Sequence, residues 1–130
     1  MYIKQISIWT ENKPDRLSEV TKILSEIDIN IRTISIVDID DSGILRLITD
    51  KPDLAKHVLE EKGFKVASDE VLGVCVEQIP DDISFLLESL GDSDIAIEYM
   101  YVFGDVIILR LNKQEEALSI LKRHNMKLFI

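Results

Sequence analysis

The sequence predicts an α+β fold made of two βαββαβ units in tandem, each an antiparallel sheet with helices on one face. Three observations predict it. The chain has 130 residues, 46% of them hydrophobic and 30% charged, which suits a soluble, globular protein. Residues 11–38 are echoed by residues 77–104 at a constant offset of 66. Within each copy, strand-like runs and helix-like apolar stripes follow one another in the same order.

The repeat covers most of the chain. Eight of its 28 aligned positions are identical, and most other core-facing pairs are conservative. After small length changes, ILRL recurs at residues 44–47 and 108–111, and AKHVLEEKGFKV (55–66) matches ALSILKRHNMKL (117–128). The identical pairs are Glu11 and Glu77, Pro14 and Pro80, Asp15 and Asp81, Ser18 and Ser84, Leu24 and Leu90, Asp28 and Asp94, Ile29 and Ile95, and Ile31 and Ile97. The chain is therefore a duplication.

The first copy begins with a strand, a helix and a hairpin. Residues 2–9 alternate between apolar and polar, as a half-buried strand does. A helix begins at Pro14, and its apolar residues recur at the spacing of one helical stripe. Residues 29–37 and 44–49 are β-branched runs on either side of a turn at residues 40–43, so we expect them to form a hairpin.

A helix and a strand complete the first copy, and the second copy repeats the whole order. Pro52 opens a short helix, Gly63 ends it, and residues 64–67 form the last strand. In the second copy we expect a strand at 71–78, a helix from Pro80 to about Leu90, strands at 95–103 and 105–111, a helix at 114–124 and a strand at 126–130. Each copy therefore has the βαββαβ order.

This order is that of the ferredoxin-like fold, in which two helices cover one face of a four-stranded antiparallel sheet. Residues 68–70 are left as a short linker, so the predicted domains are residues 1–69 and 70–130. Domains this small bury a limited core, and their open sheet edges favour pairing.

Charge and composition exclude several classes of protein. The net charge is −9, and the basic residues are not clustered, so a nucleic-acid partner is not expected. No apolar run is long enough to span a bilayer, and the N-terminus does not resemble a signal peptide; we expect no membrane partner and a cytoplasmic location. The single Cys75 lies in an apolar run and is interpreted as a packing residue.

The repeated junction ENKPDRL (11–17) has physical features of a ligand site. The start of a helix carries unsatisfied N–H groups and the positive end of the helix dipole, which suit a carboxylate. Pro14 presets the backbone at the first helical position. A carboxylate such as Asp15 or Asp81 could accept from an ammonium group. Both ends of a free amino acid could therefore be bound at one loop.

The same residues carry a family resemblance. Tandem βαββαβ units that each open with N-x-P-x-x-L, here Asn12, Pro14 and Leu17, followed by DINI at residues 28–31, resemble a protein of two ACT domains. The second copy keeps Pro80 and a matching DIAI. The resemblance implies a non-catalytic regulatory protein that binds an amino acid at the interface between ACT units. It also implies a homodimer and an enzyme of amino-acid biosynthesis as partners.

The predicted ligand-binding residues combine both copies. The family usually has Gly after the proline, whereas this chain has Asp15 and Asp81, which either complement the helix dipole or favour a ligand with a cationic group. The strand IEYMYVF (97–103) places two tyrosines on one face, as walls of a mixed site or as cover for a sheet face. The predicted residues are Asn12, Lys13, Pro14, Asp15, Arg16, Leu17, Asn30, Ile31, Pro80, Asp81, Tyr99 and Tyr101.

Catalytic and cofactor sites are not expected. His57 and His124 do not align between the copies and have no cysteine near them, which argues against zinc and against a nucleophile–base pair. Asp38, Asp40 and Asp41 lack the spacing of a calcium loop and are interpreted as a turn with solvated carboxylates. The alternative to ligand binding is a structural dimerisation module whose junction loops bind nothing.

Overall fold

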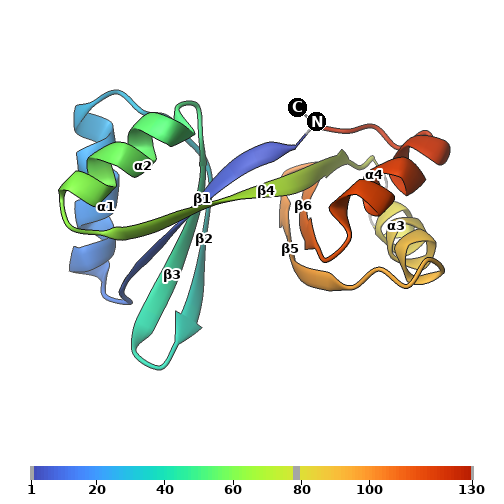
Figure 1. Cartoon of the computed structure of the whole chain (residues 1–130), viewed down its shortest axis with the longest axis horizontal. Coiled ribbons are helices and arrows are strands. Elements are labelled where there is room, and N and C mark those ends of the chain that lie inside the picture. Colours follow the sequence, from blue (N-terminus) through green and yellow to red (C-terminus); the bar gives the residue numbers. More distant parts are fainter. Residues whose placement is uncertain (1, 78–79, 130) are drawn as a thin grey trace. The chain divides into compact units, whose positions relative to one another are not determined.

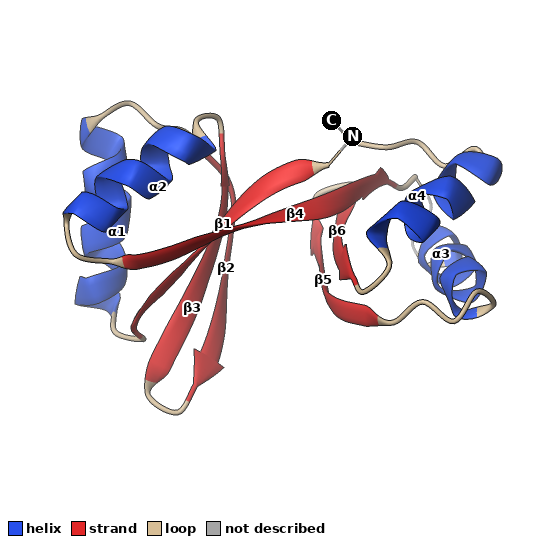
Figure 2. Cartoon of the chain, in the orientation of Figure 1, coloured by secondary structure: helices blue, strands red, loops and turns tan. Residues whose placement is uncertain are grey.

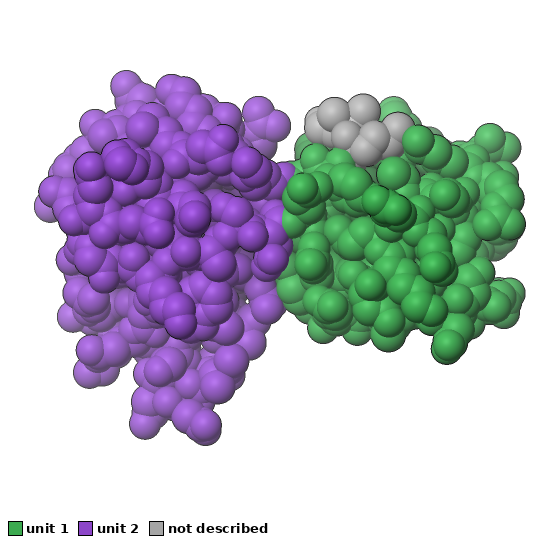
Figure 3. Space-filling view, viewed as in Figure 1, with its two compact units in different colours: residues 1–3, 70–130 green, residues 4–69 purple. Residues whose placement is uncertain are grey.

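The computed structural model describes residues 2–77 and 80–129 of the chain. Its internal contacts divide the chain into two compact units, which Figure 3 colours separately. Residues 4–69 form the first unit, and residues 1–3 with residues 70–130 form the second unit. The units are divided inside a strand, between Asp69 and Glu70.

The first unit has the βαββαβ order that the sequence predicts. Its elements are β1 (Ile3–Glu11), α1 (Pro14–Glu26), β2 (Ile31–Ile39), β3 (Ser42–Thr49), α2 (Pro52–Glu61) and the start of β4 (Lys65–Cys75). The strand order is β2-β3-β1-β4, and the pairings of β3 with β1 and β2 are antiparallel. Figure 2 shows α1 and α2 together on one face of these strands. The ferredoxin-like fold class is confirmed.

The core of the first unit lies between its sheet and its helices. In the register of the sheet, Ile6 lies opposite Leu47 and Ile8 opposite Leu45. These four side chains pack with residues of both helices and of the start of β4 in one cluster. The remaining buried members are Val20, Leu24, Ile29, Ala55, Leu59, Phe64 and Val66. The apolar stripes that the sequence predicts on the two helices therefore face the core.

The second unit repeats this arrangement around its own core. Its elements are the rest of β4, α3 (Asp81–Gly91), β5 (Ile97–Phe103), β6 (Val106–Leu111) and α4 (Gln114–Arg123), which can be followed by colour in Figure 1. The strands are ordered β4-β6-β5 and pair antiparallel. Leu72, Val74, Ile107 and Leu109 pack against residues of α3 and α4.

The repeated DI dipeptide is explained by how α1 and α3 end. Asp28 and Asp94 have positive φ of 55° and 57°, the left-handed conformation that follows many helices. The next residue folds back in each case: Ile29 N–H donates to the Leu24 carbonyl at 3.1 Å, and Ile95 N–H to the Leu90 carbonyl at 3.2 Å. These identities are therefore accounted for by helix termination.

The predicted linker at residues 68–70 is wrong, because β4 is one continuous strand from Lys65 to Cys75. Ser68, Asp69 and Glu70 are polar and read as a break between two strands. A strand needs only its backbone hydrogen bonds, however, and the side chains of Ser68 and Glu70 are exposed. The strand at 71–78 is thus the second half of β4; Gln78 lies outside the described residues.

The strand expected at residues 126–130 is reduced to one isolated bridge, between Leu128 and Val74. Cys75 N–H donates to the Lys127 carbonyl at 2.8 Å, and Phe129 N–H donates to the Gly73 carbonyl at 2.9 Å. Gly73 permits this approach, because a Cβ there would lie 3.1 Å from the Phe129 Cβ and 2.8 Å from a methyl of Ile3. Ile130 lies outside the described residues.

Candidate functional site

The predicted junction of the first unit connects β1 to α1. Lys13 is extended and precedes the helix, Pro14 occupies its first position, and no side chain caps its first turn. Arg16 N–H and Leu17 N–H both donate to the Lys13 carbonyl at 3.0 Å. Asp15 lies in the first turn and is exposed. The start of α1 thus presents its positive dipole end to solvent without a side-chain cap.

Asn12 attaches this junction to the tip of the β2–β3 hairpin. Its N–H donates to the Asp41 carbonyl at 3.4 Å, and its Nδ2 donates to the Asp38 carboxylate at 3.0 Å. Gly43 is buried beneath it, and a Cβ at Gly43 would lie 3.3 Å from the Asn12 Cβ. The close approach of junction and hairpin therefore depends on this glycine.

Together the junction and the hairpin enclose an open hollow of about 640 Å³. It is lined by Glu11, Asn12, Lys13, Asp38, Asp41 and Ser42. The Lys13 ammonium lies 3.2 Å from the Glu11 carboxylate, and both side chains are largely exposed. The hollow, which we call the junction hollow, therefore offers three carboxylates, one ammonium and uncharged hydrogen-bonding groups around a volume suited to a small molecule.

The junction hollow exists because the β2–β3 hairpin is long. Val37 pairs with Ile44, and the matching pair in the second unit is Phe103 with Val106. Residues 38–43 lie beyond the first pair, but only residues 104–105 lie beyond the second, so the first hairpin is four residues longer (6 − 2). The additional residues, 39–42, include Asp41 and Ser42 of the hollow, and Asp38 directly precedes them.

The structure brings only some of the predicted residues together. Asn12 and Lys13 line the junction hollow, and Pro14 and Asp15 follow directly in the first turn of α1. Arg16 turns elsewhere, with its guanidinium carbon 5.4 Å from the centre of the Phe64 ring. Leu17 and Ile31 are half-buried against the core of the first unit. Their positions indicate packing roles for both apolar residues.

Asn30 and Ile31 lie at the opposite end of the first unit's sheet. Ile31 pairs with Thr49 and Glu11 pairs with Ser42, so the two sites are separated by most of β3, roughly 23 Å along the strand. Asn30 is bound to Asp50 there: its N–H donates to the Asp50 carboxylate at 2.9 Å and its Nδ2 at 3.3 Å. Within one unit, these residues do not reach the junction.

The remaining predicted residues belong to the second unit. Pro80 immediately precedes α3, and Asp81 is exposed in its first turn. Tyr99 and Tyr101 are half-buried on β5 and lie opposite Arg110 and Ile108 of β6. Their sharing of one face follows from the strand alternation, but a mixed site with the first junction stays a prediction. Gln78 and Ile79, also expected at the second junction, lie outside the described residues.

Sequence reasoning missed the hairpin residues of the junction hollow. Asp38 and Asp41 were interpreted as a solvated turn, and Ser42 was read only as part of that turn. One signal was present in the sequence: the offset between the copies falls from 66 before the hairpin to 62 after it. That change marks a four-residue insertion beside the predicted junction.

No group of three or more His, Cys, Asp or Glu side chains among the described residues is placed to hold a metal ion. No described helix combines the length and apolar character needed to cross a membrane.

The family follows from comparison with known proteins. The family model of the ACT domain pair matches residues 1–129. The chain belongs to this family. The resemblance read from Asn12, Pro14 and Leu17 is thereby confirmed, and the ACT domain pair spans nearly the whole sequence.

Solved structures agree with this assignment. The ACT domain pair is 33% identical to protein BT0572 from Bacteroides thetaiotaomicron, over 99% of this chain and 92% of that one, with a TM-score of 0.92. It shares the fold of the ligand-free regulatory subunit of aspartate kinase from Thermus thermophilus, at 16% identity and a TM-score of 0.69, over 92% and 91% of the two chains. No curated protein matches the sequence.

Proposed function

We propose that this ACT domain pair is a non-catalytic regulatory protein that binds a free amino acid in the junction hollow. The observation that carries the proposal is the arrangement of charge there. Asp38 and Asp41 line one part of the hollow, and Lys13 lines another, next to the start of α1. A zwitterion needs acceptors for its ammonium group and donors for its carboxylate, and this hollow offers both within one small volume.

The helix start adds to the carboxylate-binding side. No side chain caps the first turn of α1, so the positive end of its dipole is directed at solvent. Asp15 stands where ACT domains usually have glycine, and its charge complements the same dipole. In this proposal Asp15 accepts from the ligand's ammonium group, while Lys13 and the helix dipole attract its carboxylate.

The proposed partner is an enzyme of amino-acid metabolism. The fold is shared with a protein named as a regulatory subunit of aspartate kinase, which makes an enzyme of this kind the first candidate. A ligand can regulate such a partner only if it binds one conformation or one association state more tightly than another. The proposal therefore includes a change in partner binding when the amino acid is bound.

The test is calorimetric titration of the protein with each of the twenty amino acids. We expect at least one to bind, and Asn12→Ala and Asp15→Ala each to weaken it by about tenfold, the usual cost of losing one hydrogen bond to a charged group. Replacing residues 38–43 by Gly-Asp, the hairpin end of the second unit, should abolish binding. Glu116→Ala removes an exposed carboxylate from the first turn of α4 in the second unit and serves as the matched control.

Three results would count against the proposal. One is the absence of binding for all twenty amino acids at millimolar concentration. Another is unchanged affinity in both Asn12→Ala and Asp15→Ala, which removes the first junction from the site. The third is retained binding in the variant with the shortened hairpin, because that variant lacks Asp38 and Asp41.

A second candidate function is structural dimerisation, and one observation favours it. The strand order ends in β2 and β5, and both carry exposed apolar side chains on the described surface. Ile34 and Ile36 of β2 are 53% and 45% exposed, and Val102 of β5 is 48% exposed. Apolar edge strands are suited to pairing with another chain. The proposed homodimer would use these edges with or without a ligand.

The two functions are separated by measuring mass in solution. Light scattering should show a dimer that Ile36→Lys dissociates. If the dimer forms fully without any amino acid and no amino acid binds, dimerisation alone is the function. If Ile36→Lys leaves the dimer intact, the β2 edge is not its interface.

A further inference from the structure

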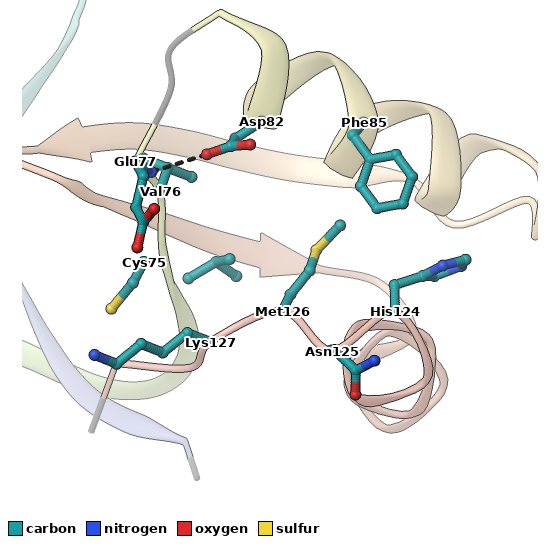
Figure 4. Close-up of a pocket in the computed structure, with 10 residues that line it drawn as sticks. Cys75, Val76, Glu77, Asp82, Phe85, His124, Asn125, Met126 and Lys127 are labelled. Carbon is teal, nitrogen blue, oxygen red and sulfur yellow. Dashed lines mark hydrogen bonds between the residues drawn. The ribbon is translucent and has the colours of Figure 1, made fainter.

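The second unit contains a hollow of its own, of about 320 Å³. It lies between the end of β4, the first turns of α3 and the segment that follows α4 (Figure 4). Val74, Phe85 and Met126 provide its apolar walls, and Cys75, Glu77 and Asp82 lie toward one end. We call it the α3 hollow. All of its lining residues belong to the second unit.

The aligned place in the first unit is filled by an arginine. Arg16 aligns with Asp82, and Phe64 aligns with Met126. The Arg16 guanidinium lies over the Phe64 ring at 5.4 Å, and its Nη1 donates to the Glu19 carboxylate at 2.6 Å. The Arg16 Nε is buried although the side chain as a whole is 41% exposed, so the guanidinium lies along the surface of the fold against the Phe64 ring. A guanidinium on an alkyl chain therefore fits this location in the repeated fold.

In the second unit three of the four aligned positions have smaller side chains, and one of these has the opposite charge. Aspartate replaces arginine at 82, methionine replaces phenylalanine at 126, and Cys75 replaces Trp9. Phe85 replaces the acceptor Glu19. The α3 hollow is lined by Asp82, Met126, Cys75 and Phe85, with a carboxylate at its wall where the first unit has a cation.

The Asp82 carboxylate is held in place by the backbone. Its Oδ2 accepts a hydrogen bond from Glu77 N–H at 2.8 Å, which Figure 4 draws as a dashed line. A carboxylate has about four lone-pair positions, so Asp82, which also takes part in a further interaction within the protein, can accept from a ligand in addition to its own partners. Glu77 itself adds a second negative charge at this end of the hollow.

The apolar side is suited to an alkyl chain. Figure 4 shows Met126 and Phe85 extending into the same space from opposite sides, whereas the ammonium of Lys127 points away from it. His124 packs edge-on against the Phe85 ring, with the centroids 5.2 Å apart and the planes at 88°, and so limits the positions of that ring. Methionine adapts its shape to a ligand, and an aromatic face attracts a cation.

We infer that the α3 hollow binds a small molecule with a guanidinium group on an alkyl chain. The guanidinium donates to the Asp82 carboxylate beside Glu77, and the alkyl chain lies between Met126 and Phe85. The ligand thus takes the place that Arg16 occupies in the first unit. This inference is independent of the amino-acid site, because it uses other residues and a ligand that needs no carboxylate.

The test uses n-butylguanidinium as the probe and methionine methyl resonances as the readout. We expect the Met126 methyl resonance, assigned with Met126→Leu, to shift saturably, while that of Met100 on β5 stays unchanged. The neutral n-butylurea, of nearly the same shape, should bind at least about tenfold more weakly because it lacks the charge. Variants of the first junction should leave the titration unchanged.

Two variants test the residues that carry the inference. Asp82→Asn keeps an acceptor for Glu77 N–H but removes the charge, and should weaken the probe by about tenfold. The double variant Asp82→Arg, Met126→Phe copies the first unit, and its own guanidinium should occupy the hollow and abolish binding. Glu116→Gln, an exposed change on α4 outside the hollow, is the matched control.

The inference is overturned if n-butylguanidinium causes no shift at Met126 at 10 mM. It is equally overturned if Met100 and Met126 shift alike, or if the double variant folds and binds the probe as tightly as the original protein. Because the probe is no amino acid, loss of amino-acid binding leaves this result unaffected, and the reverse also holds.

Discussion

The two units of the ACT domain pair share one framework and differ in what fills it. In the first unit, the Arg16 guanidinium lies over the Phe64 ring; in the second, the aligned residues Asp82 and Met126 line the α3 hollow. The difference in hairpin length instead produces a hollow in the first unit. The longer β2–β3 hairpin creates the junction hollow in the first unit.

Under the two proposals, each copy of the duplicated fold has a different site. The core positions keep their character in both copies, since they hold each sheet against its helices. The differences that create the hollows are at the margins of the core. There a side chain can be shortened, or a hairpin lengthened, without loss of the packing between sheet and helices. A site can therefore arise at a different place in each copy.

The largest expected difference between the units is at the aligned residues Phe64 and Met126. Phe64 is 8% exposed and packs under Arg16, so Phe64→Ala should cost about 3–5 kcal/mol of unfolding free energy. Met126 is half-buried beside a hollow, and Met126→Ala should cost less than about 2 kcal/mol. Urea denaturation of both variants measures the two costs. Equal losses would show that the two spaces are filled alike.

Truncating an aligned core residue should lower the stability of both units equally. Leu59 of α2 and Leu121 of α4 are aligned, and both are 0% exposed. Leu59→Ala and Leu121→Ala should each cost about 2–5 kcal/mol, because each removes the same buried group from a closed core. Since β4 has residues in both units, we expect one calorimetric transition that either variant lowers. Two transitions, of which each variant moves only one, would show that the cores unfold independently.

The smallest expected effect is a pH dependence in the second unit alone. Burial raises the pKa of the Tyr2 hydroxyl, and the carboxylates of Glu115 and Glu70 raise it further. The aligned residue of the first unit is Ser68, which does not titrate in this range. The folded state therefore holds the Tyr2 proton more tightly than the unfolded state does.

Its contribution to stability has a definite sign. It is fully present below the ordinary tyrosine pKa, and it is lost as pH rises through that value to the higher pKa of the folded state. Urea midpoints at pH 8 and pH 11 should differ less in Tyr2→Phe than in the original protein. An equal change in both proteins would assign the loss of stability to other groups.

Sequence alone determined the duplication, the order of the elements, and how the helices begin and end. Pro14 starts α1, and the left-handed Asp28 and Asp94 end α1 and α3 by returning the next residue to the last turn. These features depend on residues within one or two helical turns, so their pattern can be read along the chain. The junction containing Asn12 and Lys13 was predictable for the same reason.

Tertiary structure alone decided the continuity of β4, the reduction of the last strand to one bridge, and the position of both hollows. Arg16 and Phe64 are distant in sequence, as are Asp82 and Met126, and their shared space exists only after helix and sheet have packed. Whether that space is filled depends on side-chain volumes brought together from several elements. A local sequence pattern does not predict those volumes, because cavities depend on packing between elements.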